Sequence, residues 1–161
     1  MEADEAEELA RRASAESTLT DRPRCDPGAL AVGYLELRLA PMPRARPHLN
    51  GDLIVYPREA SAQTAAYMIA HECGHHLLHI EGWRLDRDLE EQAASRIGIA
   101  LMLPRSPFVR DALKTGRDPR ALAALWPLAT PRICLRRLVE LGLSDGAVAR
   151  PGLRRASLRR P

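Results

Sequence analysis

Two histidines four residues apart, within an otherwise apolar stretch, constrain this chain more than any other feature of its sequence. They are His71 and His75 of the segment His-Glu-Cys-Gly-His. On a helix, residues i and i+4 lie on one face a turn apart, so both imidazoles can bind a single metal ion. Glu72 lies about 100° further round the helix, where its carboxylate can take a proton from a water molecule beside the metal. The segment predicts a helix carrying a catalytic metal site; the alternative is a helix whose histidines are packed in a core.

A third ligand has to come from another part of the chain, since a catalytic zinc commonly has three protein ligands and one open position. His79 continues the histidine stripe, but eight residues of helix span about 12 Å, too far for one ion to contact all three rings. The remaining carboxylates stand at the start of the next predicted helix: Asp86, Asp88, Glu90 and Glu91.

Glu91 is our choice among these carboxylates. The positions three, four and seven residues after it are all small: Ala94, Ser95 and Gly98. A face of small residues lets this helix lie close against the histidine helix. Close packing is also a reason for a glycine in mid-helix, where it costs about 1 kcal/mol relative to alanine. Glu90 is the second choice.

The predicted elements indicate an α+β fold, in which a small antiparallel sheet packs on a helical core. Residues 32–39 alternate between leucine and polar side chains, as in a strand with one buried face. Residues 41–47 are expected to form a loop. The pair Asn50-Gly51 then accepts the backbone angles of a tight hairpin turn.

Everything after Pro57 is predicted to be helical. A helix capped by Ser61 ends before Gly82, and a second helix opens at Asp86 or Asp88 and closes at Pro104. Three further helices are expected where an N-cap residue precedes a proline: Ser106-Pro107, Asp118-Pro119 and Thr130-Pro131. Two glycines are expected to follow helix ends: Gly116 and Gly142.

Four stretches are expected along the chain. They are an N-terminal tail or surface helix (1–27), a core with the metal site (28–104), a C-terminal helical region (105–148) and a basic tail (149–161). The first stretch spaces Glu7 from Arg11, and Glu8 from Arg12, for ion pairs one helical turn apart.

The net charge of +3 is unevenly distributed. Residues 105–161 carry thirteen basic and four acidic groups, a balance of +9. Such a region can bind nucleic acid or an acidic partner. It can equally be a solvated surface, the interpretation we favour, since 23 of the 24 basic residues are arginine.

We expect a cytoplasmic protein without a membrane segment. No apolar run approaches the roughly 20 residues that span a bilayer. The first residues are acidic, whereas a secretion signal begins with basic and then apolar residues. The three cysteines (Cys25, Cys73 and Cys134) are therefore expected to be thiols.

Two segments resemble the ImmA/IrrE family of metallopeptidases. Residues 66–79 contain His-Glu-Cys-Gly-His, and residues 91–104 read Glu-Gln-Ala-Ala-Ser-Arg-Ile-Gly-Ile-Ala-Leu-Met-Leu-Pro. The second is similar to the family's Glu-x-x-Ala-Asn-x-Phe-Ala-Ala helix, which ends near Leu-Leu-Met-Pro. The resemblance covers about residues 52–104. Three positions depart from the family pattern: Ser95 replaces Asn, Ile97 replaces Phe and Gly98 replaces Ala.

The resemblance implies zinc bound by His71, His75 and Glu91, with Glu72 as general base. It also implies a zinc-dependent endopeptidase that cleaves a protein partner, typically a helix-turn-helix transcriptional repressor in mobile elements or stress responses. The same ligand set accepts manganese or iron. An alternative from another class is a metal-bearing regulatory module that binds a repressor or DNA without proteolysis.

Residues 121–143 are similar to the helix-turn-helix-like C-terminal part of the family. Arg132, Arg136 and Arg137 are the candidates there for a contact with DNA or a repressor. The alternative, which we favour over direct DNA binding, is a helical scaffold with a solvated basic face.

The sequence also supports predictions for two cysteines and one tyrosine. Cys25 lies in Pro-Arg-Cys-Asp-Pro-Gly, which resembles the cysteine switch of the unrelated matrixin proenzymes. Its thiolate could occupy the open zinc position; the alternative is a loop cysteine of no consequence. Cys73 is expected to face away from the metal, into the core. Tyr67, one turn before His71, is expected to be a packing residue rather than an oxyanion stabiliser.

Overall fold

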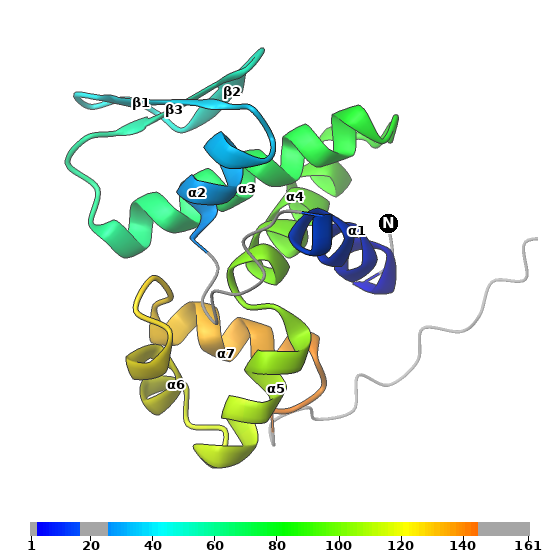
Figure 1. The fold of residues 1–161 in the computed structure, drawn as a ribbon, viewed down its shortest axis with the longest axis vertical. Coiled ribbons are helices and arrows are strands. Elements are labelled where there is room, and N and C mark those ends of the chain that lie inside the picture. The colour runs from blue at the N-terminus through cyan, green and yellow to red at the C-terminus, as the bar shows by residue number, and fades with distance from the viewer. Residues whose placement is uncertain (1–2, 17–25, 145–161) are drawn as a thin grey trace, which may run out of the picture.

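The computed structural model describes residues 3–16 and 26–144, which form seven helices and one three-stranded sheet. The helices are α1 (Ala3–Glu16), α2 (Pro27–Gly33), α3 (Ala62–Ile80), α4 (Arg87–Met102), α5 (Arg105–Lys114), α6 (Pro119–Leu125) and α7 (Pro131–Glu140). The strands are β1 (Arg38–Met42), β2 (His48–Asn50) and β3 (Leu53–Pro57). Figure 1 shows the sheet at one end, α3 and α4 in the middle, and α5 to α7 at the other end. The predicted α+β fold is confirmed.

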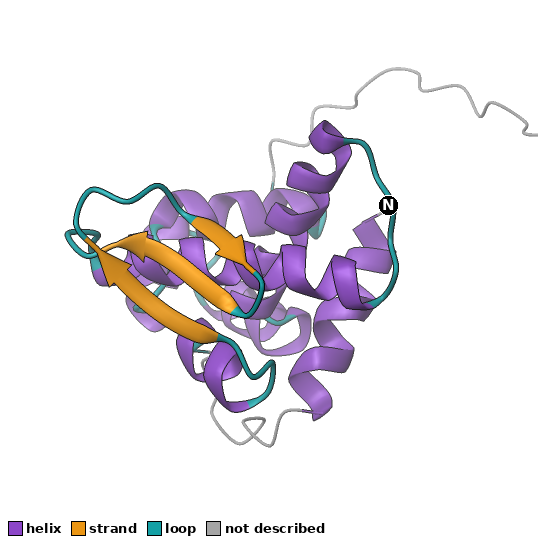
Figure 2. Cartoon of the chain, turned by 90° about the horizontal axis from the view of Figure 1, so that it is seen from above, coloured by secondary structure: helices purple, strands orange, loops and turns teal. Residues whose placement is uncertain are grey.

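The sheet is mixed, whereas an antiparallel sheet was predicted from the sequence. The Asn50-Gly51 turn is confirmed: Gly51 has a φ of 60°, and β2 pairs antiparallel with β3. However, the strand order is β1-β3-β2, with β1 parallel to β3. The chain reverses between β1 and β2, and β3 then inserts between them (Figure 2). The order in space therefore differs from the order in sequence, and β2 becomes an edge strand.

The first predicted strand was wrong over most of its length. Its start belongs to α2, where the Asp26 carboxylate accepts a hydrogen bond from the Gly28 backbone N–H at 2.9 Å. Leu35 and Leu37 are buried as predicted, but Glu36 between them has a φ of 56°, which no strand accommodates. The signal for the helix was present, because Asp26-Pro27 is an N-cap followed by proline.

The two helices predicted around the metal site are confirmed. Ser61 caps α3 through a hydrogen bond from the Thr64 backbone N–H, and Gly82 follows its end with a φ of 73°. Asp86 caps α4, which ends just before Pro104. Helices α3 and α4 pack along each other (Figure 1), so the side chains on their facing sides can contact one another.

The N-terminal helix α1 packs against α4. One face of it is buried in the main core: Ala6, Leu9, Ala10 and Ala13. Its ion pairs differ from the predicted ones, since Arg11 pairs with Glu8 and Arg12 with Glu81. The predicted basic tail and the segment with Cys25 lie outside the described residues.

The C-terminal helices form a second core with the start of α3 and the end of α4. Its largest buried members are Phe108, Leu122, Trp126 and Leu138. The starts at Asp118-Pro119 and Thr130-Pro131 are confirmed, as are the glycines after α5 and α7. The start at Ser106-Pro107 was wrong: α5 begins at Arg105. Pro107 stands inside the first turn, where its missing N–H breaks no helical hydrogen bond.

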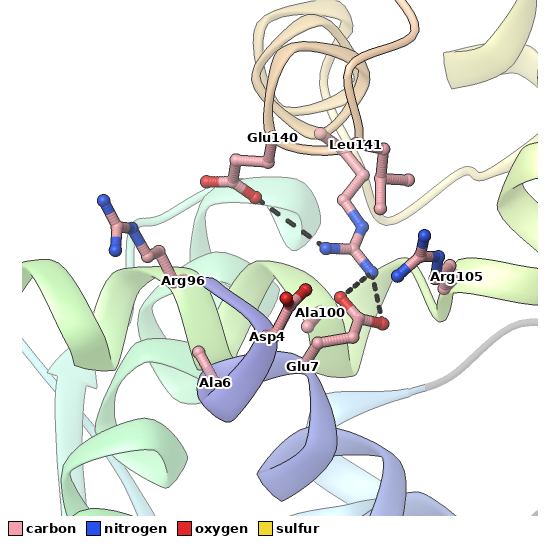
Figure 3. A pocket seen from close by; sticks show the side chains of 9 residues that line it. Asp4, Ala6, Glu7, Arg96, Ala100, Arg105, Glu140 and Leu141 are labelled. Carbon is pink, nitrogen blue, oxygen red and sulfur yellow. Dashed lines mark hydrogen bonds and ion pairs between the residues drawn. The ribbon is translucent and has the colours of Figure 1, made fainter. Parts of the chain in front are cut away.

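Arg137 of α7 is buried, with 3% of its surface exposed, and joins three helices. Figure 3 shows the carboxylates of its two ion-pair partners, Glu7 and Glu140. Its Nη2 lies 2.7 Å from a Glu7 carboxylate oxygen on α1. Its Nε donates to the Leu103 carbonyl, at the end of α4, at 2.9 Å. Because this guanidinium is buried and used within the fold, Arg137 is not part of the solvated basic face that we favoured, nor is it exposed for the alternative contact with DNA or a repressor.

No helix within residues 3–16 and 26–144 combines the length and the apolar character needed to cross a bilayer.

Candidate metal centre

The two motif histidines lie on the face of α3 that meets α4. Their Nε2 atoms are 3.2 Å apart, and their rings meet edge to face with centroids 4.8 Å apart. Two nitrogen ligands of a tetrahedral zinc ion lie about 3.3 Å apart, given Zn–N bonds of about 2.0 Å. The predicted i, i+4 geometry thus brings both imidazoles to one point.

Glu91 of α4 faces that point. Its carboxylate oxygens lie 3.2 Å from Nε2 of His71 and 3.7 Å from Nε2 of His75. One ligand atom from each of the three residues falls within 4.8 Å of the others. Two imidazole nitrogens and a carboxylate oxygen are a donor set that zinc accepts, so the residues present fit such an ion.

Close backbone packing explains why α4 reaches this position. A Cβ placed on Gly74 of α3 would lie 2.9 Å from the Cα of Ala94 on α4. Real Cβ atoms hardly ever come so near, so glycine allows the approach. The prediction that a small-residue face brings α4 against the histidine helix is confirmed.

Glu90, the second choice for the third ligand, lies elsewhere. Its carboxylate is 2.9 Å from Nδ1 of His75, the ring nitrogen opposite the one that faces Glu91. It therefore contacts the back of a predicted ligand and not the point where the ligand atoms meet.

Ser95 contacts the back of the other histidine. Its Oγ lies 3.2 Å from Nδ1 of His71, and the Tyr67 hydroxyl lies 3.5 Å from the same oxygen. From the sequence, Ser95 was expected to be a small packing residue where the family pattern has Asn. Its position four residues after Glu91, one turn along the same face, was the signal that could have identified this contact.

Glu72 is 5% exposed and lies beside the point where His71, His75 and Glu91 meet. Burial raises the pKa of its carboxyl above the usual value, and the negative charge of Glu91 adds to this. A backbone hydrogen bond from Leu49 in β2 acts in the opposite direction. A carboxyl with a raised pKa can both accept and return a proton near neutral pH.

Burial also lowers the pKa of His71, so that its neutral form is favoured. The charges of His75 and Arg136 lower this pKa further, whereas Glu91 raises it. The neutral imidazole is the form that binds metals.

A cleft of about 660 Å³ opens over these residues. The edge strand β2 and the helices α3 and α4 line it, with Pro47, His48, Leu49, Tyr67, Met68, His71, Glu72, His75, His79, Glu90 and Glu91. Its walls are both polar and apolar, as in sites that bind peptides or other organic ligands.

The remaining predicted side chains take the following places. His79 lines the cleft but is not part of the three-residue cluster. Cys73 is fully buried, as predicted. Cys134 is fully buried as well, and burial raises the pKa of its thiol to about 11. His48 is exposed on β2.

The fold and the site together define a metallopeptidase-like protein, with paired histidines and a glutamate on one helix and an acidic residue from the next. The family model of the IrrE N-terminal-like domain, peptidase M78, matches residues 32–134, well over half of the chain. This protein therefore belongs to that family, as its resemblance to ImmA/IrrE indicated. No curated protein shows a significant match to the chain.

Proposed function

We propose that this protein is a zinc-dependent endopeptidase in which His71, His75 and Glu91 bind the metal and Glu72 is the general base. The observation that carries the proposal is the convergence of these three side chains within 4.8 Å, beside a buried carboxyl whose pKa is raised. Manganese or iron would suit the same donors, so the metal is part of what the experiment measures.

Zinc, when bound, supplies a Lewis acid that polarises a peptide carbonyl and makes a nearby water molecule more acidic. The Glu72 carboxylate would accept one proton of that water as the water oxygen bonds to the carbonyl carbon. It would then give this proton to the amine nitrogen as the C–N bond breaks. His71, His75 and Glu91 would hold the metal, and Glu72 would carry the proton between the two steps.

We further propose that the substrate binds as an extended chain along β2. This strand is at the edge of the sheet, and the backbone of Leu49 reaches toward Glu72. An edge strand offers backbone N–H and C=O groups that can pair with another strand. A peptide lying there would present its backbone to His71, His75 and Glu91 across the cleft.

The proposed substrate is a transcriptional repressor of the helix-turn-helix type, as the resemblance to ImmA/IrrE implies. In this proposal the C-terminal helices contact the repressor with the exposed face of α7, which carries Arg132 and Arg136. Direct DNA binding is not part of the proposal.

The first experiment measures metal content by mass spectrometry in the purified protein, in Glu91→Ala and in Gln92→Ala. Gln92 is the exposed neighbour of Glu91 on α4 and serves as the matched control. We expect about one zinc per chain in the wild type and in Gln92→Ala, and a clear loss in Glu91→Ala. A wild type that binds no metal, even when zinc is supplied, contradicts the proposal.

The second experiment compares the protein N termini in cells that produce either the wild type or Glu72→Gln. We expect Glu72→Gln to keep its metal and to lose the new N termini that the wild type creates. Bound metal with identical sets of N termini would instead indicate a regulatory module without proteolysis.

A further inference from the structure

We propose that Glu90 and Ser95 are positioning residues that orient the two metal-binding histidines, each through the ring nitrogen that faces away from the metal. This inference rests on the proposed function, because it takes His71 and His75 as metal ligands. It concerns residues with no ligand role of their own, both on α4.

Glu90 orients His75. The Nδ1 atom of this ring lies 2.9 Å from the Glu90 carboxylate, while Nε2 faces His71 and Glu91. A carboxylate only accepts hydrogen bonds, so Nδ1 carries the proton and Nε2 keeps its lone pair for a metal. A carboxylate on the back of a ligand also makes the ring a stronger donor.

Ser95 does the same for His71, through a weaker group. Its Oγ lies 3.2 Å from Nδ1, and Nε2 of this ring again faces His75 and Glu91. The Tyr67 hydroxyl, 3.5 Å from Ser95 Oγ, donates to the same oxygen. If Nε2 of His71 binds the metal, the proton of the neutral ring is on Nδ1, and the Ser95 oxygen accepts it.

The two histidines therefore have unequal partners, one charged and one neutral. A charged acceptor forms the stronger hydrogen bond, although the Glu90 side chain is 45% exposed and water weakens its effect. We expect Glu90 to matter more for metal affinity than Ser95, and both to matter less than a direct ligand.

A single helix supplies all of these groups. Glu90 and Ser95 stand on either side of Glu91 along α4, and the packing of Gly74 against Ala94 sets how α4 lies against α3. The placement of α4 against α3 thus determines both where the third ligand lies and how the two histidines are oriented.

The test measures the Zn²⁺ dissociation constant by competition with a chelating dye, on the full-length protein. We expect Glu90→Ala to weaken binding roughly 10-fold to 100-fold, and Ser95→Ala roughly 10-fold, the range known for partners of ligand histidines. Glu90→Gln should fall between wild type and Glu90→Ala, because its amide oxygen still accepts the Nδ1 proton. Ser95→Asn should restore affinity relative to Ser95→Ala for the same reason.

Two controls separate positioning from general effects. Asp88→Ala removes an exposed acidic residue from the first turn of α4 without touching a histidine, and should leave the dissociation constant unchanged. Circular dichroism of the metal-free variants checks that each one folds.

A second measurement detects orientation directly. Long-range proton–nitrogen NMR spectra of the zinc-bound protein show which ring nitrogen of each histidine carries a proton. We expect a slowly exchanging proton on Nδ1 of His75 in the wild type, and its fast exchange in Glu90→Ala.

The outcomes are distinguishable. If the wild type binds zinc and the alanine variants bind it equally well, the inference is wrong and the proposed function stands. If Glu90→Gln loses as much affinity as Glu91→Ala, Glu90 is a ligand and the inference is also wrong. A wild type that binds no zinc overturns both.

Discussion

Gly98 of α4 lies so close to Ala70 of α3 that a Cβ on Gly98 would come within 2.8 Å of the Ala70 carbonyl. The next atom it would meet is the backbone nitrogen of His71, at 2.9 Å. The glycine that departs from the family pattern therefore sits directly against the residue that precedes a predicted metal ligand. The contact of Gly98 with Ala70 and His71 therefore belongs both to the packing of α4 on α3 and to the surroundings of the candidate metal site.

Gly98→Ala is expected to destabilise the protein and weaken its metal affinity. Alanine favours a helix by about 1 kcal/mol over glycine. Against this, the atoms it would strike belong to the backbone of α3 and cannot rotate away, and overpacking of this kind costs about 1 to 3 kcal/mol. We expect a net loss of about 1 kcal/mol in the free energy of unfolding, measured by urea denaturation.

Gly33→Ala provides the matched control for that variant. Gly33 is the last residue of α2, and a Cβ there would meet nothing within 4 Å. Its free energy of unfolding should equal or exceed that of the wild type. Equal effects at the two glycines would contradict the packing argument.

Glu7→Gln is expected to destabilise the fold, because it leaves the guanidinium of Arg137 buried with less compensating charge. Removing one partner of a buried ion pair costs about 3 to 5 kcal/mol. Glu140 remains 3.8 Å from Arg137, so we expect a smaller loss, about 2 to 3 kcal/mol by the same reasoning. Glu8→Gln breaks the exposed pair with Arg11 and should leave the urea midpoint unchanged. Equal midpoints for the two variants would show that Arg137 does not need Glu7.

Glu140 is expected to make stability depend on pH. Burial raises the pKa of its carboxyl in the folded protein, more than Arg136 and Arg137 lower it. The folded state then holds the proton more tightly than the unfolded state. This contribution to stability is present below the unfolded value of about 4.5 and is lost as the pH rises through the folded pKa.

The comparison of Glu140→Gln with the wild type isolates that contribution. Between pH 4 and pH 7, the free energy of unfolding of the variant should rise relative to that of the wild type, because glutamine never ionises. Urea titrations at a series of pH values measure the difference. A difference that does not change with pH, or that changes in the other direction, would contradict the assignment.

Metal removal is expected to lower the melting temperature without unfolding the protein. The proposed ligands join α3 to α4, so the metal stabilises the folded state alone. At a free metal concentration about 1,000 times the dissociation constant, the gain is about 4 kcal/mol. The two cores remain when the metal is gone, unlike those of a zinc finger. Calorimetry should show one cooperative transition for each form, at a lower temperature when a chelator has removed the metal. An unfolded metal-free protein would contradict this.

The local features of this protein were determined by its sequence. Ser61 and Asp86 cap their helices, Asn50-Gly51 turns the hairpin, and His71 and His75 share a helix face. Each of these depends on residues within one or two turns, so its geometry follows from spacing and side-chain chemistry alone. The position of Glu91 beside both histidines also followed from the sequence, since the small residues after it allow the close approach of α4. Its role as a metal ligand stays a prediction.

Only the tertiary structure decided the relations between distant segments. The sequence left Glu90 as a rival ligand, and the rotation of α4 against α3 placed it behind His75 instead. The insertion of β3 between β1 and β2, and the burial of Arg137 against Glu7, likewise join segments far apart in the chain. Such relations depend on how whole elements pack, and side-chain spacing within one element is not enough to determine them.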